Sequence, residues 1–486
     1  MKAKYLYDDL RGWMEEAKKL DELREVDGLS WQEEIGVATE FINRTDPAPA
    51  AVFDKIPGYP KGHRVLVNSF GGKRMNMTLG FPTNLRKVEL SNAFLEDFME
   101  AKPIPYQVVE KGPILENVQT GNDVNVLSFP TPLWHELDGG RYIGTGSYDI
   151  TQDPDEKWIN LGTYRVMVHD EKSVGFYISP GKHGRVHRDK HMARNQPMPT
   201  AIVVGGDPLL FLLACTELPY GVSEYEFAGA LRGKPYQVIK GKVTGLPIPA
   251  HAEIVLEGFV DPKKRRREGP FGEWTGYYAS DVREEPVMDV KAIYYRNNPI
   301  ILGAPPQRPP DEMCRYRAVL RSGFLKQELE KAGLSGIKSV WAHEVGNARM
   351  LLAIAIEQRY GGHAAQVGHV ASQCHVGAYA GKYVMVVDDD VDVSDLEELM
   401  WAVITRSDPA TSIDIIHHAW STALDPRIPP EDKAKGKLTN SRAIIDATRP
   451  YDWRDQFPKV NMASPERARK AKEKYSYLLE GLTQKP

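Results

Sequence analysis

The chain has 486 residues, of which 62 are Lys or Arg and 66 are Asp or Glu, giving a formal net charge of −4. This length predicts two or three domains, and the acidic balance argues against general nucleic-acid binding, which needs a basic face. Three cysteines occur without a CxxC pair, so a disulfide framework and a zinc ribbon are both disfavoured, and a reducing cytoplasm is the expected compartment.

Residues 1–114 are predicted to form an N-terminal α/β domain. The chain starts with an amphipathic helix pattern (Leu6, Leu10, Trp13, Met14) instead of the apolar segment of a secretory signal. Short apolar runs at 51–53 and 64–67 then alternate with helix-like segments, as the strands of an α/β domain do.

Residues 115–305 follow a different pattern, in which short strand candidates are separated by Gly, Pro and Asp turns. A β-barrel or sandwich is therefore expected, with helices only near Asp207-Pro208 and from Ser223 to Leu231. The most apolar stretch of the chain, 209–215, is too short to span a bilayer. The strand candidates are 142–150, 159–169, 174–178, 201–204, 236–243, 252–259 and 287–295.

Residues 306–486, which follow a Pro-rich connector, are predicted to form a second α/β domain. The run 383–387 ends in three aspartates, 388–390, and a helix is expected at 394–404. Three carboxylates at a strand end are able to bind a metal, but an acidic loop before a helix N-terminus is the favoured interpretation. A charged amphipathic helix at 464–482 is expected to dock on a partner subunit or on its own chain.

Two carboxylates flank a tight turn in Glu268-Gly269-Pro270-Phe271-Gly272-Glu273, directly after five cations at 263–267. Gly and Pro disfavour a helix, so both acids are expected on a loop. In a shared cavity, repulsion and desolvation would raise the pKa of one acid and leave it a proton donor. The alternative is that both acids are solvated and balance the basic run, which is itself expected in a solvated loop.

Three histidines, His183, His187 and His191, recur every four residues, a spacing that on a helix would suit a transition metal. Gly184 and the preceding Pro-Gly make a helix through His183 doubtful, and the many neighbouring charges favour a surface position for His187 and His191. A three-histidine zinc site is therefore the less favoured interpretation. His183 alone, in a Gly-flanked loop, is a candidate for a barrel mouth.

Asn160 and Arg165 belong to one strand pattern, five residues apart. Side chains alternate along a strand, so these two residues would fall on opposite faces unless a bulge at Gly162 intervenes. From this run alone, Arg165 is interpreted as a solvated strand cation.

Over nearly its full length the chain resembles the UbiD family of prenylated-flavin-dependent reversible decarboxylases. Four ordered segments carry the resemblance: Trp158-Ile159-Asn160-Leu161-Gly162-Thr163-Tyr164-Arg165, Pro180-Gly181-Lys182-His183-Gly184, Gly221-Val222-Ser223-Glu224-Tyr225-Glu226-Phe227-Ala228-Gly229, and the segment from Glu268 to Glu273. The resemblance implies an α+β multidomain fold, in which a central split β-barrel holds prenylated FMN between N-terminal and C-terminal α/β domains. The C-terminal domain, with its terminal helix, is expected to form a homodimer or a higher homo-oligomer.

Site residues follow from the resemblance by position. Asn160, His183 and Glu224 match manganese ligands that tie the cofactor phosphate to the protein, an oxygen and nitrogen donor set that suits such an ion. Ala214 and Thr216 match a potassium site. Thr163, Tyr164, Arg165, Lys182, His183 and Lys382 match cofactor-contacting positions, although some family members carry a neutral residue in place of Lys182. Glu268, Arg165 and Glu273 match the catalytic network, with Glu273 as proton donor.

The implied activity is the removal or addition of a carboxyl group on an aromatic, heteroaromatic or α,β-unsaturated acid through a covalent adduct with prenylated FMN. CO2 is then a product or substrate, and a flavin prenyltransferase supplies the cofactor. A flavin reductase or oxidase using unmodified FMN is one alternative, and a non-catalytic metal-binding assembly subunit is another. His417, His418 and Trp420 are expected either to line an aromatic substrate pocket or to form a strand end with one histidine buried.

Overall fold

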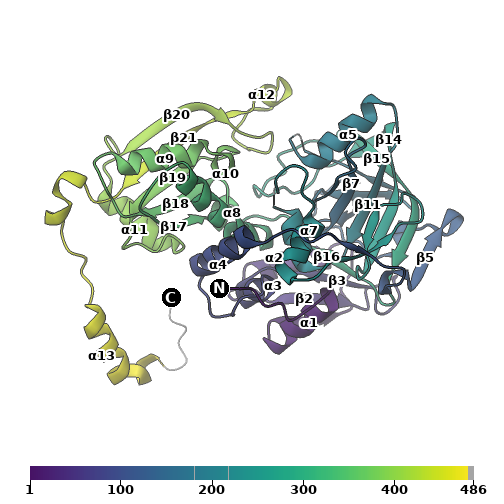
Figure 1. Ribbon diagram of the computed structural model, residues 1–486, viewed down its shortest axis with the longest axis horizontal. Coiled ribbons are helices and arrows are strands. Elements are labelled where there is room, and N and C mark those ends of the chain that lie inside the picture. The colour runs from purple at the N-terminus through teal and green to yellow at the C-terminus, as the bar shows by residue number, and fades with distance from the viewer. Residues whose placement is uncertain (180, 217, 480–486) are drawn as a thin grey trace.

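The computed structural model describes residues 1–179, 181–216 and 218–479, and within them the strands form four sheets. Figure 1 shows the C-terminal unit as one lobe, in green and yellow, and the central and N-terminal units together as the other. The short 3-10 helices span Pro113–Leu115, Gly121–Asp123, Val126–Ser128, Glu344–Gly346, Tyr451–Gln456 and Ser476–Leu479.

The N-terminal unit is built on a four-stranded sheet in the order β1-β2-β3-β16. Its last strand comes from a distant part of the chain, since β16 follows the central unit in sequence and pairs in parallel with β3. The predicted strands at 51–53 and 64–67 are confirmed. The elements are α1 (Leu10–Lys19), β1 (Leu23–Asp27), α2 (Glu34–Asn43), β2 (Ala50–Asp54), β3 (Arg64–Val67), α3 (Gly72–Thr78), α4 (Lys87–Glu100) and β16 (Ile300–Gly303).

The central unit is a large antiparallel sheet in the order β6-β9-β10-β15-β14-β11-β7-β8, with β5 beside β15. It curls into half a barrel, which confirms the predicted split barrel between two α/β units. Its strands are β5 (Asn117–Thr120), β6 (Tyr142–Gly144), β7 (Tyr148–Gln152), β8 (Ile159–Gly162), β9 (Val166–Asp170), β10 (Ser173–Gly175), β11 (Met198–Val204), β14 (Ile254–Glu268) and β15 (Arg283–Tyr295).

Three helices and a small sheet, β13-β12-β4, complete the central unit. Helices near Asp207-Pro208 and Ser223 are confirmed, and the Asp207 carboxylate caps α6 by accepting a hydrogen bond from the Leu209 N–H at 2.9 Å. These elements are β4 (Gln107–Val108), α5 (His183–Ala193), α6 (Pro208–Ala214), α7 (Glu224–Arg232), β12 (Gln237–Lys240) and β13 (Pro247–Pro249).

The basic run 263–267 lies in strand β14, so the expectation of a solvated loop is wrong. Cross-strand and neighbouring acids neutralise part of its charge, because Lys264 pairs with Asp289 and Arg266 with Asp170. Alternate residues of the run point away from these acids and are exposed. Strand pairing to β15 therefore outweighs the repulsion within the run.

The C-terminal unit has a five-stranded sheet in the order β17-β18-β19-β21-β20, in which β18, β19 and β21 are parallel. The favoured interpretation of the three aspartates holds only in part: Asp389 and Asp390 lie in an exposed turn, but Asp388 ends β19 and is buried, and the residue that caps α11 is the later Asp395. The elements are α8 (Glu312–Lys331), β17 (Ile337–Ala342), β18 (Leu351–Ile356), α9 (His363–Gln373), α10 (His375–Ala378), β19 (Tyr383–Asp388), α11 (Leu396–Arg406), β20 (Ile413–Trp420), α12 (Pro430–Ala434), β21 (Thr439–Ala447) and α13 (Pro465–Tyr475).

Aromatic packing joins the units through α4, α7 and α8. The Phe98 ring stacks on Phe227 with centroids 4.6 Å apart and meets Phe324 edge-on at 5.1 Å. One buried core continues from these residues into the C-terminal sheet. By contrast, α13 lies apart from the body of its unit (Figure 1). No helix among the described residues combines the length and apolar character needed to cross a membrane.

Candidate active site

Arg165 bridges Glu268 and Glu273. Its Nη2 donates a hydrogen bond to Glu268 Oε2 at 2.7 Å, and its Nη1 donates to Glu273 Oε1. Glu268 ends strand β14, and Glu273 lies on the loop that follows. The two glutamates are 1% and 6% exposed, so the alternative of two solvated acids is wrong, and so is the interpretation of Arg165 as a solvated cation.

An interruption of the predicted strand, between β8 and β9, places Arg165 at this site. The predicted strand 159–169 is divided, since β8 ends at Gly162 and β9 begins at Val166. Residues 163–165 are not part of a strand, so Arg165 is freed from the side-chain alternation that would set it opposite Asn160. The expected bulge is thus a full interruption.

Two aromatic rings hold the Arg165 guanidinium. Its Cζ lies 5.1 Å from the Tyr177 ring and 5.2 Å from the Phe271 ring, distances at which an arginine is attracted to an aromatic face. Burial lowers the pKa of Arg165, but the charges of Glu273 and Glu268 outweigh it and raise that pKa above its usual range. The guanidinium is therefore a permanent cation that both carboxylates share.

Side chains that sequence reasoning missed complete this network. The Tyr142 hydroxyl donates to Glu268 Oε1 at 3.0 Å, and the Ser280 hydroxyl donates to Glu273 Oε1 at 3.3 Å. Phe271 lies within the motif from Glu268 to Glu273. An aromatic residue on a turn that contains Gly269 and Gly272 was the sequence signal that could have identified it. Neither Tyr142 nor Ser280 carries a local signal in the sequence. Tyr142 is 126 positions from Glu268, and Ser280 is 7 positions from Glu273, so only the fold brings each pair into contact.

Asn160 and Glu224 lie together, since the Glu224 carboxylate accepts a hydrogen bond at 2.7 Å from the backbone N–H of Leu161, next to Asn160. Glu224 is the first residue of α7, and His183 is the first residue of α5. The His183 ring meets Trp158, two positions before Asn160, at a centroid distance of 5.0 Å. The three predicted metal ligands therefore come from the start of two helices and one strand of the same unit.

The chemistry of these residues fits a divalent cation. Burial raises the pKa of Glu224 to about 8, and backbone N–H groups offset this only in part. A cation would stabilise the ionised carboxylate, and carboxylate, amide oxygen and imidazole are donors that manganese accepts.

Tyr164 fits between two glycines. A Cβ at Gly162 would come within 2.2 Å of the Tyr164 hydroxyl, and one at Gly184 within 2.5 Å. The hydroxyl also accepts a hydrogen bond from the Gly184 N–H at 3.2 Å. Gly184 is therefore required by close packing, and α5 begins at His183 with Lys182 as N-cap, so the doubt about a helix there is wrong.

The expectation that His187 and His191 lie on the surface is also wrong. The His187 side chain is fully buried, and the His191 side chain is largely buried. The His187 Nδ1 lies 3.0 Å from the Thr151 hydroxyl, and its ring meets Trp158 at 4.9 Å. Burial lowers the pKa of His187 to about 4, so this ring is neutral. Among the described residues, no group of three His, Cys, Asp or Glu side chains is arranged to hold a metal ion.

The remaining predicted residues lie around this centre or in the other lobe. Ala214 ends α6, and the Thr216 hydroxyl donates to the Leu212 carbonyl at 3.0 Å. The Thr163 side chain forms a hydrogen bond with Cys215, the residue between Ala214 and Thr216 in the sequence. Lys382 belongs to the C-terminal unit, where its ammonium pairs with Asp425 at 2.8 Å.

His417 and His418 are both exposed on β20, an edge strand. The expectation of one buried histidine is therefore wrong. Trp420 is 57% exposed and contacts Tyr379.

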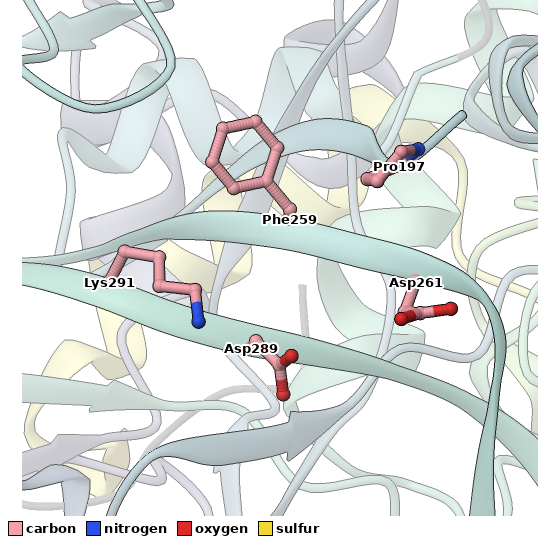
Figure 2. A pocket seen from close by; sticks show the side chains of 5 residues that line it. All are labelled: Pro197, Phe259, Asp261, Asp289 and Lys291. Carbon is pink, nitrogen blue, oxygen red and sulfur yellow. The ribbon is translucent and has the colours of Figure 1, made fainter.

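A separate surface hollow of about 350 Å³ lies over β14 and β15 (Figure 2). Its lining residues, drawn as sticks in the figure, are Pro197, Phe259, Asp261, Asp289 and Lys291. None of the predicted site residues is among them, so this hollow is distinct from the Arg165 centre.

Comparison with known proteins decides the family. Three models described as domains of 3-octaprenyl-4-hydroxybenzoate carboxy-lyase match in order: the N-terminal domain at residues 14–93, the Rift-related domain at 107–309 and the C-terminal domain at 315–447. The chain belongs to the UbiD family of carboxy-lyases. This membership sets aside the flavin reductase and the assembly subunit as alternatives.

UbiD relatives align with almost the whole chain. Pyrrole-2-carboxylic acid decarboxylase of Pseudomonas aeruginosa is 31% identical over 87% of each sequence. The vanillic acid decarboxylase structure of Sedimentibacter hydroxybenzoicus in open form has a TM-score of 0.84 at 30% identity, covering 98% of this chain and 100% of that chain. An evolved dimeric UbiD-class enzyme of Pelotomaculum thermopropionicum, in complex with prFMN, has a TM-score of 0.80 at 25% identity, covering 96% and 99%.

Proposed function

We propose that the protein is a reversible decarboxylase of an aromatic or heteroaromatic carboxylic acid that uses prenylated FMN. The observation that carries this proposal is the buried arrangement in which Arg165 bonds to both Glu268 and Glu273. Two of the compared relatives act, by name, on an aromatic acid, one phenolic and one pyrrolic. Decarboxylation at an sp² carbon needs an electron sink, which prenylated FMN supplies when bound.

Glu273 is proposed as the acid that protonates the substrate carbon after the carboxyl group leaves. Glu268 accepts hydrogen bonds from Arg165 and Tyr142, whereas Glu273 accepts them from Arg165 and Ser280. Glu273 follows a glycine on the loop, next to the same guanidinium. The two carboxylates thus share Arg165 but differ in their other partner, a phenol for Glu268 and an aliphatic hydroxyl for Glu273. Unequal environments of this kind allow one acid to stay charged while its neighbour transfers a proton.

Residues around the strand break are proposed to hold the cofactor. Asn160, His183 and Glu224 would bind manganese and, through it, the cofactor phosphate. Carbonyl or hydroxyl oxygens of Ala214 and Thr216 would bind potassium. Cofactor contacts are assigned to Thr163, Tyr164, Arg165, Lys182 and His183, with Lys382 from the other lobe. A flavin prenyltransferase would supply the cofactor, and the free thiols of Cys215, Cys314 and Cys374 are compatible with a reducing cytoplasm.

A substrate and cofactor panel tests this function. The chain produced together with a flavin prenyltransferase is expected to exchange ring hydrogen for deuterium, in the presence of CO2, on phenolic and pyrrolic acids or their decarboxylated products. The chain loaded with FMN alone is expected to be inactive on the same compounds, because unmodified flavin lacks the electron sink. Exchange only on cinnamic or aliphatic acids would contradict the aromatic assignment, and full activity with FMN would contradict the cofactor.

A homodimer formed by the C-terminal unit is proposed as the working assembly. Tyr477 and Leu478, just after α13, are 63% and 59% exposed, and large exposed apolar residues mark contact surfaces. Removing residues 459–486 is expected to convert the dimer to a monomer in light scattering after size exclusion. The double substitution Tyr477→Ser, Leu478→Ser is expected to weaken the dimer, whereas Leu6→Ser, equally exposed at 60% but N-terminal, serves as the matched control. An unchanged mass after truncation would contradict the role of residues 459–486 in dimer formation.

A further inference from the structure

The loop 269–273, which ends in Glu273, is held on one side by a second loop, residues 135–139. The Asp138 carboxylate makes the contact: its Oδ1 accepts a hydrogen bond from the Gly272 N–H at 2.9 Å, and its Oδ2 lies 3.0 Å from the His135 Nδ1. Oδ2 also accepts from the backbone N–H of His135 at 3.2 Å. Asp138 thus binds Gly272, the residue directly before the proposed proton donor Glu273.

The two loops touch backbone to backbone. The Gly139 N–H donates to the Pro270 carbonyl at 2.8 Å. A Cβ at Gly139 would lie 2.0 Å from the Gly269 carbonyl oxygen, and a Cβ at Gly272 would lie 2.7 Å from the His135 Nδ1. No side chain fits at either glycine, so the distance between the loops is fixed by close packing.

The Asp138 side chain is fully buried. It accepts hydrogen bonds from the backbone N–H of His135, from the Nδ1 of the His135 ring and from the backbone N–H of Gly272. An ionised carboxylate only accepts, so the proton of the His135 ring lies on Nδ1. The His135 Nε2 is buried without a partner among the described residues. The ring also meets Phe271 edge-on at 6.0 Å, and the Phe271 ring in turn holds Arg165.

We propose that Asp138 and His135 are a positioning pair that fixes the 269–273 loop so that Glu273 reaches Arg165 and the reacting carbon. The pair holds the two residues that precede Glu273: Gly272 through its N–H and Phe271 through its ring. Misplacing a reacting group by about 1 Å can cost roughly a hundredfold in rate, so a loop of glycines needs such an anchor. The inference rests on the proposed role of Glu273.

The test uses cofactor-loaded enzyme and compares Asp138→Asn, Glu273→Gln and the double variant. Asp138→Asn is expected to lower kcat by about a hundredfold, with KM and prenylated-FMN absorbance nearly unchanged, because it disturbs the placement of an acid and not substrate binding. The double variant is expected to be no slower than Glu273→Gln, since Asp138 acts through Glu273.

A second pair of variants separates positioning from folding. In His135→Asn the side-chain amide nitrogen takes the place of Nδ1 and retains the donor to Asp138, so kcat is expected to stay within about tenfold of wild type. His135→Leu has a similar volume and no donor, and its kcat is expected to fall by about a hundredfold. Equal kcat values for these two variants would overturn the role of the His135 donor, whether or not Asp138→Asn folds.

The remaining outcomes distinguish this inference from the proposed function. Wild-type kcat in Asp138→Asn beside an inactive Glu273→Gln would overturn the positioning pair alone. A double variant slower than Glu273→Gln would show that Asp138 acts apart from Glu273 and would also overturn it. Wild-type activity in Glu273→Gln would instead contradict the proposed role of Glu273 as proton donor, on which the pair rests.

Discussion

Glu273→Gln is expected to lower decarboxylation by about a hundredfold or more, the scale of removing a general acid, while the protein keeps its fold and its flavin. Glutamine is isosteric and still accepts the Arg165 hydrogen bond, but it has no proton to transfer to carbon. The measurement is single-turnover decarboxylation together with hydrogen exchange on the product.

Glu284→Gln provides the matched control, because Glu284 is an exposed acid on β15, opposite Arg267 of the same hairpin. Its turnover is expected to equal that of wild type. Near-normal turnover in Glu273→Gln would remove Glu273 from the mechanism and leave Glu268 as the candidate acid.

Glu224→Ala and His183→Ala are expected to lose manganese and flavin together, since one ion would join protein and phosphate. Metal analysis and flavin absorbance of the purified variants measure this loss. Glu226→Ala, two positions along α7 and half-buried, is the matched control and is expected to retain both. Stoichiometric flavin in a metal-free Glu224→Ala would contradict the bridging ion.

The pH dependence of the metal-free protein gives an independent check of Glu224. Burial raises its pKa to about 8 from the usual 4.5. Between these values the folded chain binds more protons than the unfolded chain, so stability falls as the pH rises through this window. Metal-free Glu224→Gln, which cannot ionise, is expected to lose less stability from pH 5 to pH 8 in urea unfolding. Manganese is expected to restore the wild type with release of a proton.

The order of the units could be predicted from the sequence because each has a different pattern of elements. Short strands separated by turns fill 142–295, and most of them form the central sheet, whereas the candidate 236–243 contributes β12 to the small sheet. The basic run 263–267 was misassigned because local charge repulsion suggests a loop, whereas the long-range pairing of β14 with β15 decides the structure. Local patterns carry no information about such a partner.

The site could be predicted only in part for a similar reason. Glu268 and Glu273 share one motif, which made a common cavity one of two interpretations, but Glu268 lies in strand β14 and not on the expected loop. The burial of Arg165 and His187 was not predictable, because the rings that contact them, Phe271 and Trp158, are distant in the sequence. Tyr142, on β6, reaches Glu268, at the end of β14, only because the sheet is curled.

The parallel pairing of β16 with β3 has a consequence for how the chain is made. β3 ends at Val67, and β16 begins only at Ile300. At the synthesis rate of roughly 5 to 20 residues per second, about ten to fifty seconds pass before the ribosome has made the last strand of the N-terminal sheet. During that time the nascent chain presents the open edge of β3, a surface on which a second nascent chain can pair. The N-terminal sheet is thus completed only after the half-barrel has been synthesised, which links the folding of the two units in time.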